Sequence, residues 1–547
     1  MTSRAKRYRE IVDTLSVHGF GFGLGAVGLQ GRFPFRRGLP GHEPGRMYSQ
    51  PEHLRLALEQ LGPTFIKVGQ ILSTRPDLLP PDYLTELAKL QDDAAPVPTD
   101  EMLEVIAEEL GSTAVFEVLD PRPLASASIG QAYAAEVGGV EVVVKVRRPG
   151  VMETVERDLE ILASLAQRAR RHVALAREHD VVGVVEEFAR TLRRELDYLR
   201  EADNAERFAT NFAGDADVHV PAVLWETTTS RVLTLERVRG LKVDDLAGLD
   251  AAGIDRRALA QRAVRVLCRM VFEDGFFHAD PHPGNFFVLP DGRLGLIDFG
   301  MVGELDDDLR HRLVSLMGAL VRRDAARATR ALLDLAEPSA TVDEAALREE
   351  VAVLIDRFGA LTLAEVSVAE LVQEVLALLR RHRLRMPSDL ALLAKTLLMA
   401  EGLGVRLDPD FQVSTVLAPY AKRLLADELG PDALVRRMTQ MLRDVLAAGA
   451  QAPRDLHGLA QALGRDGLDL HLRTSELAPL VVELDRIGNR VVAGVVAAAL
   501  VDGLSRVVTA GPSRRGALTR PLLVLGTGAL AVAGGCLAAT ARSRART

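Results

Sequence analysis

Apolar side chains recur along this chain with two different periods, and the changes of period divide it into candidate domains. From residue 50 to about 112 they recur at helical spacing, whereas residues 113–146 show the short apolar and alternating runs typical of strands. Helical spacing returns over residues 151–212 and dominates from residue 255 to about 485. A strand-rich stretch followed by a long helical one predicts an α+β fold with two lobes.

The first residues differ from the rest because they are rich in Gly and Arg and show no clear period. They are expected to form a mobile or membrane-surface leader, although an ordinary disordered leader fits equally well. We therefore predict five segments: a leader at 1–48, a helical extension at 49–112, a strand-rich N-lobe at 113–240, a helical C-lobe at 241–485 and a C-terminal membrane anchor at 486–547.

The predicted anchor rests on two apolar runs near the end of the chain. Residues 521–541 are uncharged over the roughly 20 residues that span a bilayer, so we expect a transmembrane helix, with a buried core helix as the alternative. Residues 491–501 form a shorter run that stops at Asp502, which fits a second span or an interfacial helix. Arginines flank 521–541 equally on both sides and do not set its orientation.

Composition limits the classes of function. The chain has 547 residues and a formal net charge of -8, which argues against a general nucleic-acid-binding protein. Its two cysteines, Cys268 and Cys536, lie far apart and indicate no disulfide framework, which favours a reducing compartment. The abundance of Ala and Arg is typical of a GC-rich bacterial genome. Together with the predicted anchor and the reducing compartment, this leads us to expect a protein of the bacterial inner membrane whose two lobes face the cytoplasm.

Residues 276–303 carry two carboxylates and an amide at the spacing of a protein-kinase active site. Asp280 is followed five positions later by Asn285, and thirteen positions after that by Asp298, within Asp-Phe-Gly. Kinases show H-R-D-x-x-x-x-N and then D-F-G, and here Ala279 stands in place of the Arg. Because Mg²⁺ prefers oxygen ligands, Asn285 and Asp298 are candidate metal ligands. Asp280 is the candidate group that orients or deprotonates an attacking hydroxyl.

A predicted hairpin connects the two candidate metal ligands. Residues 286–289 and 294–297 are apolar and flank the turn Pro290-Asp291-Gly292. We expect this hairpin to bring Asn285 and Asp298 together at its open end. The alternative is a hairpin whose polar flanks are incidental.

The N-lobe carries a candidate nucleotide site. Between two predicted strands lies a loop of small residues, and the third strand carries Lys145, the candidate partner of the α- and β-phosphates. Small side chains let the backbone approach phosphate, although Ala restricts positive φ where Gly does not. Backbone groups near Glu236 and Val238, at the end of the last strand, would meet adenine. The loop consists of Ala125, Ser126, Ala127 and Ser128.

In a kinase-like lobe, one acidic side chain must pair with Lys145. On a continuous helix, Glu195 and Glu201 would face different directions, whereas Asp197 and Glu201 would share a face. A solvated helix face explains any one of these acids equally well. Spacing therefore leaves the partner open.

Two further features concern access to the site. Lys67 stands alone in an apolar helical run, which by pattern is typical of a surface lysine whose stem lies along apolar surface. After Gly300 the chain enters a helical pattern almost at once and carries no A-P-E motif. The platform on which kinases bind peptides is therefore predicted to be missing or short.

From about residue 50 to its C-terminus, the chain resembles the UbiB/AarF (ABC-one/ADCK-like) family of atypical kinases. Lys67-Val68-Gly69-Gln70 resembles the K-x-G-Q motif of that family, and Glu195-Leu196-Asp197 resembles its E-x-D motif. The loop at Ala125–Ser128 resembles its alanine-rich loop, with Ser126 where Ala is usual. His278-Ala279-Asp280 and Asp298-Phe299-Gly300 resemble its active site.

The resemblance implies a role for each motif. Lys145 would pair with Glu201, Asp280 would be the catalytic carboxylate, and Asn285 and Asp298 would bind Mg²⁺ beside ATP. Gating would fall to Lys67 and Gln70, with Lys67 held over the site by Glu195 and Asp197.

The resemblance also implies slow ATPase activity or phosphorylation of a small or lipid-like substrate, in support of isoprenoid quinone metabolism. The expected partners are a quinone precursor or other lipid, the membrane and quinone-biosynthesis enzymes, and no nucleic acid. One alternative is a nucleotide-sensing membrane scaffold without phosphotransfer. A Ser/Thr protein kinase is disfavoured by Lys67 and by the missing A-P-E.

Overall fold

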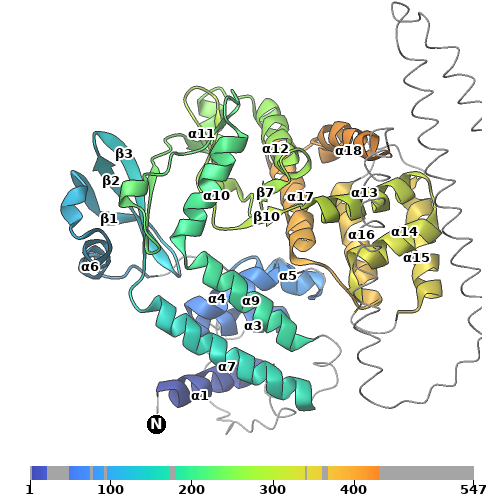
Figure 1. Ribbon diagram of the computed structural model, residues 1–547, viewed down its shortest axis with the longest axis horizontal. Coiled ribbons are helices and arrows are strands. Elements are labelled where there is room, and N and C mark those ends of the chain that lie inside the picture. Colours follow the sequence, from blue (N-terminus) through green and yellow to red (C-terminus); the bar gives the residue numbers. More distant parts are fainter. Residues whose placement is uncertain are drawn as a thin grey trace, which may run out of the picture. The chain divides into compact units, whose positions relative to one another are not determined.

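The computed structural model describes residues 3–20, 48–73, 75, 78–90, 95–172, 180–338, 342–359 and 367–429. Every described residue belongs to one compact unit within residues 1–437, whose helices and strands are labelled in Figure 1. No helix in these ranges is long and apolar enough to cross a membrane. Residues 491–501 and 521–541, for which the sequence predicts membrane segments, lie outside the described ranges.

The predicted N-lobe contains a four-stranded antiparallel sheet in the order β1-β2-β3-β5. Val142, Val144 and Val146 of β3 point to one face, where they pack with Tyr133 against Met102 of helix α6. The elements of this region are α6 (Thr99–Leu110), η2 (Thr113–Val115), β1 (Val118–Ser126), β2 (Gly130–Val137), β3 (Val140–Arg147), α7 (Val151–His172), α9 (Val181–Glu195), α10 (Tyr198–Asn211), β4 (Val218–His219), η3 (Trp225–Thr227) and β5 (Val232–Glu236).

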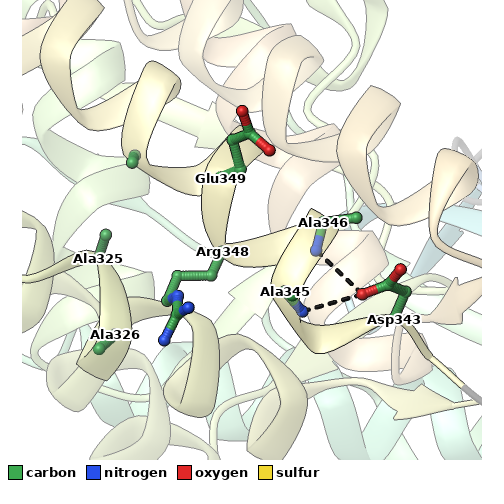
Figure 2. A pocket seen from close by; sticks show the side chains of 8 residues that line it. Ala325, Ala326, Asp343, Ala345, Ala346, Arg348 and Glu349 are labelled. Atoms are coloured by element: carbon green, nitrogen blue, oxygen red, sulfur yellow. Dashed lines mark hydrogen bonds between the residues drawn. The ribbon is translucent and has the colours of Figure 1, made fainter.

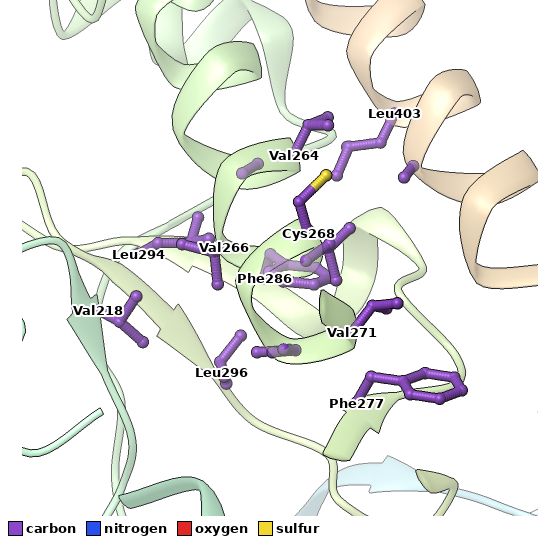
Figure 3. Close-up of a cluster of buried hydrophobic side chains, with 14 of the residues drawn as sticks. Val218, Val264, Val266, Cys268, Val271, Phe277, Phe286, Leu294, Leu296 and Leu403 are labelled. Atoms are coloured by element: carbon purple, nitrogen blue, oxygen red, sulfur yellow. The ribbon is translucent and has the colours of Figure 1, made fainter. Parts of the chain in front are cut away.

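The C-lobe is built around one helix, α12 (Arg256–Phe272), which buries a broad apolar face and exposes a polar one. Figure 3 shows Val264, Cys268 and Val271 of this helix among Phe286 and Leu403 from neighbouring elements. An amphipathic helix of this kind turns its apolar face toward the core of the domain. The strands that bear the catalytic motifs therefore pack directly on a rigid core.

The hairpin predicted between Asn285 and Asp298 is confirmed. Its strands pair in the register Phe286 with Leu296, and they belong to a small sheet in the order β4-β9-β8-β6. Its elements and those before it are β6 (Leu241–Lys242), α11 (Leu246–Ala251), α12 (Arg256–Phe272), β7 (Phe276–His278), η4 (Pro283–Asn285), β8 (Phe286–Val288) and β9 (Leu294–Leu296).

The segment after Gly300 is as short as the sequence predicts. Residues 301–306, all of which the structure describes, contain strand β10 paired with β7, and helix α13 follows at once. The remaining elements are β10 (Val302–Glu304), α13 (Asp307–Val321), α14 (Ala325–Leu335), β11 (Glu337–Pro338), α15 (Glu344–Gly359), α16 (Val368–Arg381), β12 (Leu384–Arg385), α17 (Ser388–Leu407) and α18 (Val413–Leu429).

The helical extension packs on α7 and α9, as its apolar periodicity requires. Ser49 and Glu52 form a reciprocal capping box that starts α3. The extension consists of α3 (Gln50–Leu61), α4 (Pro63–Ser73) and α5 (Pro81–Leu87).

The expected leader differs from the structure over residues 3–20, which are helical. Helix α1 (Ser3–Leu15) and the following η1 (Ser16–Phe20) pack against α3, and Ile11 is fully buried. The apolar side chains Tyr8, Ile11 and Leu15 do follow a helical period. The basic residues between them and the Gly-rich sequence after them obscure this short pattern.

Besides its apolar contacts, α1 makes polar contacts with α3 and α7 through Arg7. Its Nε and Nη2 donate to the two carboxylate oxygens of Asp158 on α7 at 2.8 Å each, and Nη2 also donates to the Leu61 carbonyl. The Asp158 side chain is completely buried. Arg4, one turn earlier, forms a comparable but exposed ion pair with Glu160 of the same helix.

Arg7→Met should lower the free energy of unfolding by about 3–5 kcal/mol, because it leaves a buried carboxylate without its partner. Arg4→Met is the matched control and should change it by less than about 1 kcal/mol, since exposed ion pairs contribute little. Chemical denaturation measures both. Equal effects of the two substitutions would show that α1 does not dock through Arg7.

His278, the last residue of β7, is buried in the aromatic core beside Phe208 and Phe286. Its Nδ1 accepts the N–H of Asp280 at 3.1 Å, so the ring is neutral with its proton on Nε2. Burial lowers the pKa of His278 below its ordinary value, more than the nearby Asp298 and Asp280 raise it.

This burial predicts a pH dependence of stability. The unfolded chain takes up a proton on His278 near pH 6.5, while the folded protein does so only at lower pH. Above about pH 6.5, His278 should therefore not change the free energy of unfolding. Below that pH, the free energy of unfolding should fall by up to about 1.4 kcal/mol per pH unit, because the unfolded chain binds a proton that the folded protein does not. His278→Gln should flatten the slope between pH 5 and 7, and the exposed His311→Gln should leave it unchanged. An identical slope in wild type and His278→Gln would contradict the neutral buried histidine.

Candidate active site

Strand β3 places Lys145 on the face of the sheet opposite its buried valines, because side chains alternate along a strand. Its Nζ lies 2.5 Å from Oε1 of Glu201 on α10 and 3.8 Å from Oδ1 of Asp298. Burial by itself would lower the pKa of Lys145, but Asp298 and Glu201 together raise it above its ordinary value. The lysine is therefore a charged group held between two carboxylates.

The helix that the sequence suggests over the acidic motif is broken. Helix α9 ends at Glu195, and α10 starts at Tyr198 with Asp197 as its N-cap, whose side chain accepts the Leu199 N–H at 3.2 Å. The comparison of helix faces was therefore wrong, since it assumed one continuous helix. The break lets Glu201 reach Lys145 while Glu195 contacts a different lysine.

That lysine is Lys67 on α4, whose Nζ lies 3.2 Å from Glu195 Oε2. Both side chains are largely buried, so the interpretation of Lys67 as a surface residue was wrong. Gln70 serves the extension itself, because its Nε2 donates to the Leu90 carbonyl at 3.2 Å. Gly69 is required by space: a Cβ there would lie 2.1 Å from a methyl carbon of Leu90. Three motif residues thus fix α4 between α9 and the segment after α5.

Asp298 begins the Asp-Phe-Gly segment beside Lys145. Burial would raise the pKa of Asp298, but Lys145, the N–H of Gly300 and, more weakly, Lys67 hold it well below its ordinary range. The next residue anchors this carboxylate. Phe299 is fully buried, and its carbonyl accepts the Asn204 side-chain amide at 2.9 Å. Helix α10 therefore positions both Glu201 and the Asp-Phe-Gly segment.

Asp280 and Asn285 occupy the loop between β7 and β8. The Asn285 amide N–H donates to the Asp280 carbonyl at 3.1 Å, which leaves the amide oxygen as the atom that can face a cation. Asp298 is ionised and its side chain is 46% exposed. An amide oxygen and an ionised carboxylate are the types of ligand that Mg²⁺ takes beside phosphate oxygens, so both residues stay candidate metal ligands. Within the described ranges, no group of three or more His, Cys, Asp or Glu side chains is placed to hold a metal alone.

Sequence reasoning missed one residue of this site, Lys395 on α17. Its Nζ donates to Oδ1 of Asp280 at 2.8 Å. Burial would raise the pKa of Asp280, but Lys395 lowers it below its ordinary value. The available signal was a single lysine in the apolar run of residues 390–400, the same pattern that marks Lys67.

The structure agrees only in part with the predictions for the small-residue loop and for the end of strand β5. The Ser126 hydroxyl accepts from Arg148 Nη2 at 2.9 Å, the Ala127 N–H donates to the Gly130 carbonyl, and Ser128 is buried. The prediction of a loop was wrong for Ala125 and Ser126, which end β1 and pair with Ala132 and Gln131 of β2. Ala127 and Ser128 lie between the two strands. At the end of β5, the Glu236 N–H donates to the Ala222 carbonyl at 2.8 Å, so it is not available to adenine.

The prediction also covers the Glu236 carbonyl and the N–H and carbonyl of Val238. These backbone groups stay predicted adenine contacts.

A separate open hollow lies between α14 and α15 (Figure 2). Among its charged lining residues, Asp343 is already used, because its carboxylate accepts the N–H groups of Ala345 and Ala346 at the start of α15. None of the predicted site residues is among those that line it, which are Ala325, Ala326, Asp343, Ala345, Ala346, Arg348, Glu349 and Ala352.

Two family models match the chain. The ABC1 atypical kinase-like domain matches residues 89–332, and the UbiB helical domain matches residues 351–412. The first range contains Lys145, Glu201 and the catalytic motifs, whereas the second contains Lys395.

Several known proteins are similar over most of the chain. A probable protein kinase UbiB of Xanthomonas campestris pv. campestris is 37% identical over 469 residues, which are 83% of this chain and 84% of that protein. An uncharacterised Synechocystis protein is 36% identical over 438 residues, 79% of this chain and 75% of the relative. A solved structure of a Mycobacterium tuberculosis protein with erythromycin covers 68% of this chain and 94% of its own, at 24% identity and a TM-score of 0.43. The family models and the relatives place the chain in one family: it belongs to the UbiB family of ABC1 atypical kinase-like proteins.

Proposed function

We propose that this chain binds Mg-ATP at the site around Lys145 and Asp298 and uses it at a membrane in support of isoprenoid quinone or related lipid metabolism. The observation that carries the proposal is the group formed by Lys145, Glu201 and Asp298, in which one ammonium lies between two carboxylates. This arrangement presents a fixed cation to nucleotide phosphates next to an ionised metal ligand.

Each residue has a defined task in this proposal. Lys145, held by Glu201, contacts the α- and β-phosphates, and backbone groups of the segment Ala125–Ser128 approach the same phosphates. Asn285 and Asp298 hold Mg²⁺, which when bound would neutralise charge on the phosphate oxygens. Asp280 orients the attacking hydroxyl or water and accepts its proton.

The surroundings of the site favour an acceptor that is not a protein. Residues 301–306 connect the Asp-Phe-Gly segment to α13 without an extended platform for a peptide. Lys67 pairs with Glu195, and its charge contributes weakly to the low pKa of Asp298, which supports the proposal that the extension covers this side of the site. A small or lipid-like acceptor, such as a quinone precursor, is the substrate class that this access suits. The predicted anchor at 486–547 would hold the site at the membrane, near quinone-biosynthesis enzymes.

A second candidate is a nucleotide-sensing membrane scaffold that hydrolyses ATP without transferring phosphate to a lipid. A phosphorylated lipid or quinone precursor in a reaction with Mg-ATP would exclude this candidate, and release of phosphate to water alone would support it.

Asp298→Asn should reduce ATP turnover of the purified protein by a factor of about 100 or more, because it removes the charged metal ligand. Asp291→Asn is the matched control, since Asp291 lies in the exposed turn of the same hairpin and pairs only locally with Arg293. Turnover measured by phosphate release should be unchanged in the control. Wild-type turnover in Asp298→Asn would show that the nucleotide site is assigned wrongly.

The same two variants test the biological part of the proposal. Cells in which Asp298→Asn replaces the wild-type protein should show altered quinone or lipid profiles by mass spectrometry, and cells with Asp291→Asn should not. If Asp298→Asn lost ATP turnover in vitro but left every quinone and lipid level unchanged, the proposed ATP-using activity would stand. The proposed role in quinone or lipid metabolism would then be refuted.

A further inference from the structure

Helix α17 brings Lys395 into the centre of the kinase-like site from outside the kinase-like domain. The ABC1 domain match ends at residue 332, and Lys395 lies within the UbiB helical domain at 351–412. Its ammonium nevertheless lies 2.8 Å from Asp280 Oδ1 and 4.0 Å from the sulfur of Met301, which follows the Asp-Phe-Gly segment. The Lys395 side chain is only 18% exposed.

The position of Lys395 is fixed by contacts on both sides of it along α17. Asp389, near the start of the helix, accepts the Glu304 N–H of β10 at 3.2 Å. Thr396 donates to the carbonyl of His278, the residue two before Asp280, at 3.3 Å. Leu393 and Leu403 are buried in the same core as α12. The ammonium is thus delivered by a rigid helix and does not reach the site on a loose side chain.

The Asp280 carboxylate has one contact on each oxygen. Lys395 binds Oδ1 at 2.8 Å, and the Asn285 amide faces Oδ2 at 3.5 Å, while the backbone N–H of Asp280 donates to His278 Nδ1. Without Lys395, Oδ1 would lose the one charged partner within ion-pair distance among the described residues. The carboxylate could then rotate, and its second oxygen would no longer have a set direction toward the acceptor.

We propose that Lys395 is a positioning residue for Asp280, so that the UbiB helical domain completes the active site of the kinase-like domain. Its Nζ holds one carboxylate oxygen, which leaves the other directed at the acceptor hydroxyl. This inference rests on the proposed function, because it concerns the step in which Asp280 acts. A purely structural ion pair between the two domains is the competing explanation, and the two differ in what Lys395 does to turnover.

The test is steady-state ATP turnover by the purified full chain, with a melting temperature measured for each variant. Lys395→Met should lower kcat about 10- to 100-fold, the range expected for a hydrogen bond between charged groups, and should leave KM for ATP within about 2-fold. Lys395→Arg should recover most of kcat, because it restores a cation at Oδ1. The control is Lys422→Met, at an exposed position on α18, which should change neither parameter. If Lys395→Met does not fold, Lys395→Gln takes its place.

A double variant separates positioning from an independent role. In the Asp280→Asn background, Lys395→Met should cause no further loss of kcat, because the group on which Lys395 acts is already changed. Two results would overturn the inference while the proposed function stands. One is a double variant whose loss of kcat is the product of the two single losses, and the other is a Lys395→Met enzyme with wild-type kcat and only a lower melting temperature. A wild-type protein without ATP turnover would overturn both.

Discussion

The ion pair between Lys145 and Glu201 is the interaction on which the rest of the site depends. Removing either partner would leave a charge in a place where water cannot fully compensate it, which typically destabilises a protein by about 3–5 kcal/mol. Two local features bring these side chains together. Side chains alternate along β3, which buries Val144 on one face and turns Lys145 to the other, and the start of α10 presents Glu201. The pair keeps the lysine charged beside Asp298, and this combination of a fixed cation and an ionised ligand is what a phosphate site requires.

The two parts outside the kinase-like core each contribute a partly buried lysine to an ion pair with it. The extension contributes Lys67, whose partner Glu195 ends α9, and buried Arg75 joins Glu187 of that helix to the Met386 carbonyl just before α17. Helix α17 carries Lys395 to Asp280. Arg75 therefore links the extension, α9 and the helical domain through polar contacts.

Local patterns in the sequence predicted the local features well. The hairpin from Phe286 to Leu296 and the strand that carries Lys145 follow from short-range alternation and turn residues, and both are present. The features that were missed depend on distant partners. Lys395 and Asp280 are 115 positions apart, and the docking of α1 depends on Asp158, 151 positions from Arg7. The break at Asp197 was missed because its capping role is decided by the packing of α9 and α10 in different directions. Spacing along the chain carries no information on such contacts.

The central claim is that this group of charges is a Mg-ATP site, and calorimetric titration of the purified protein with ATP tests it most directly. The account predicts saturable binding of one ATP per chain when Mg²⁺ is present, and markedly weaker binding when a chelator removes the metal. Loss of that binding in Lys145→Met, with the exposed Lys242→Met as control, would assign it to this site. Absence of ATP binding with and without Mg²⁺, or equal binding in Lys145→Met, would contradict the account.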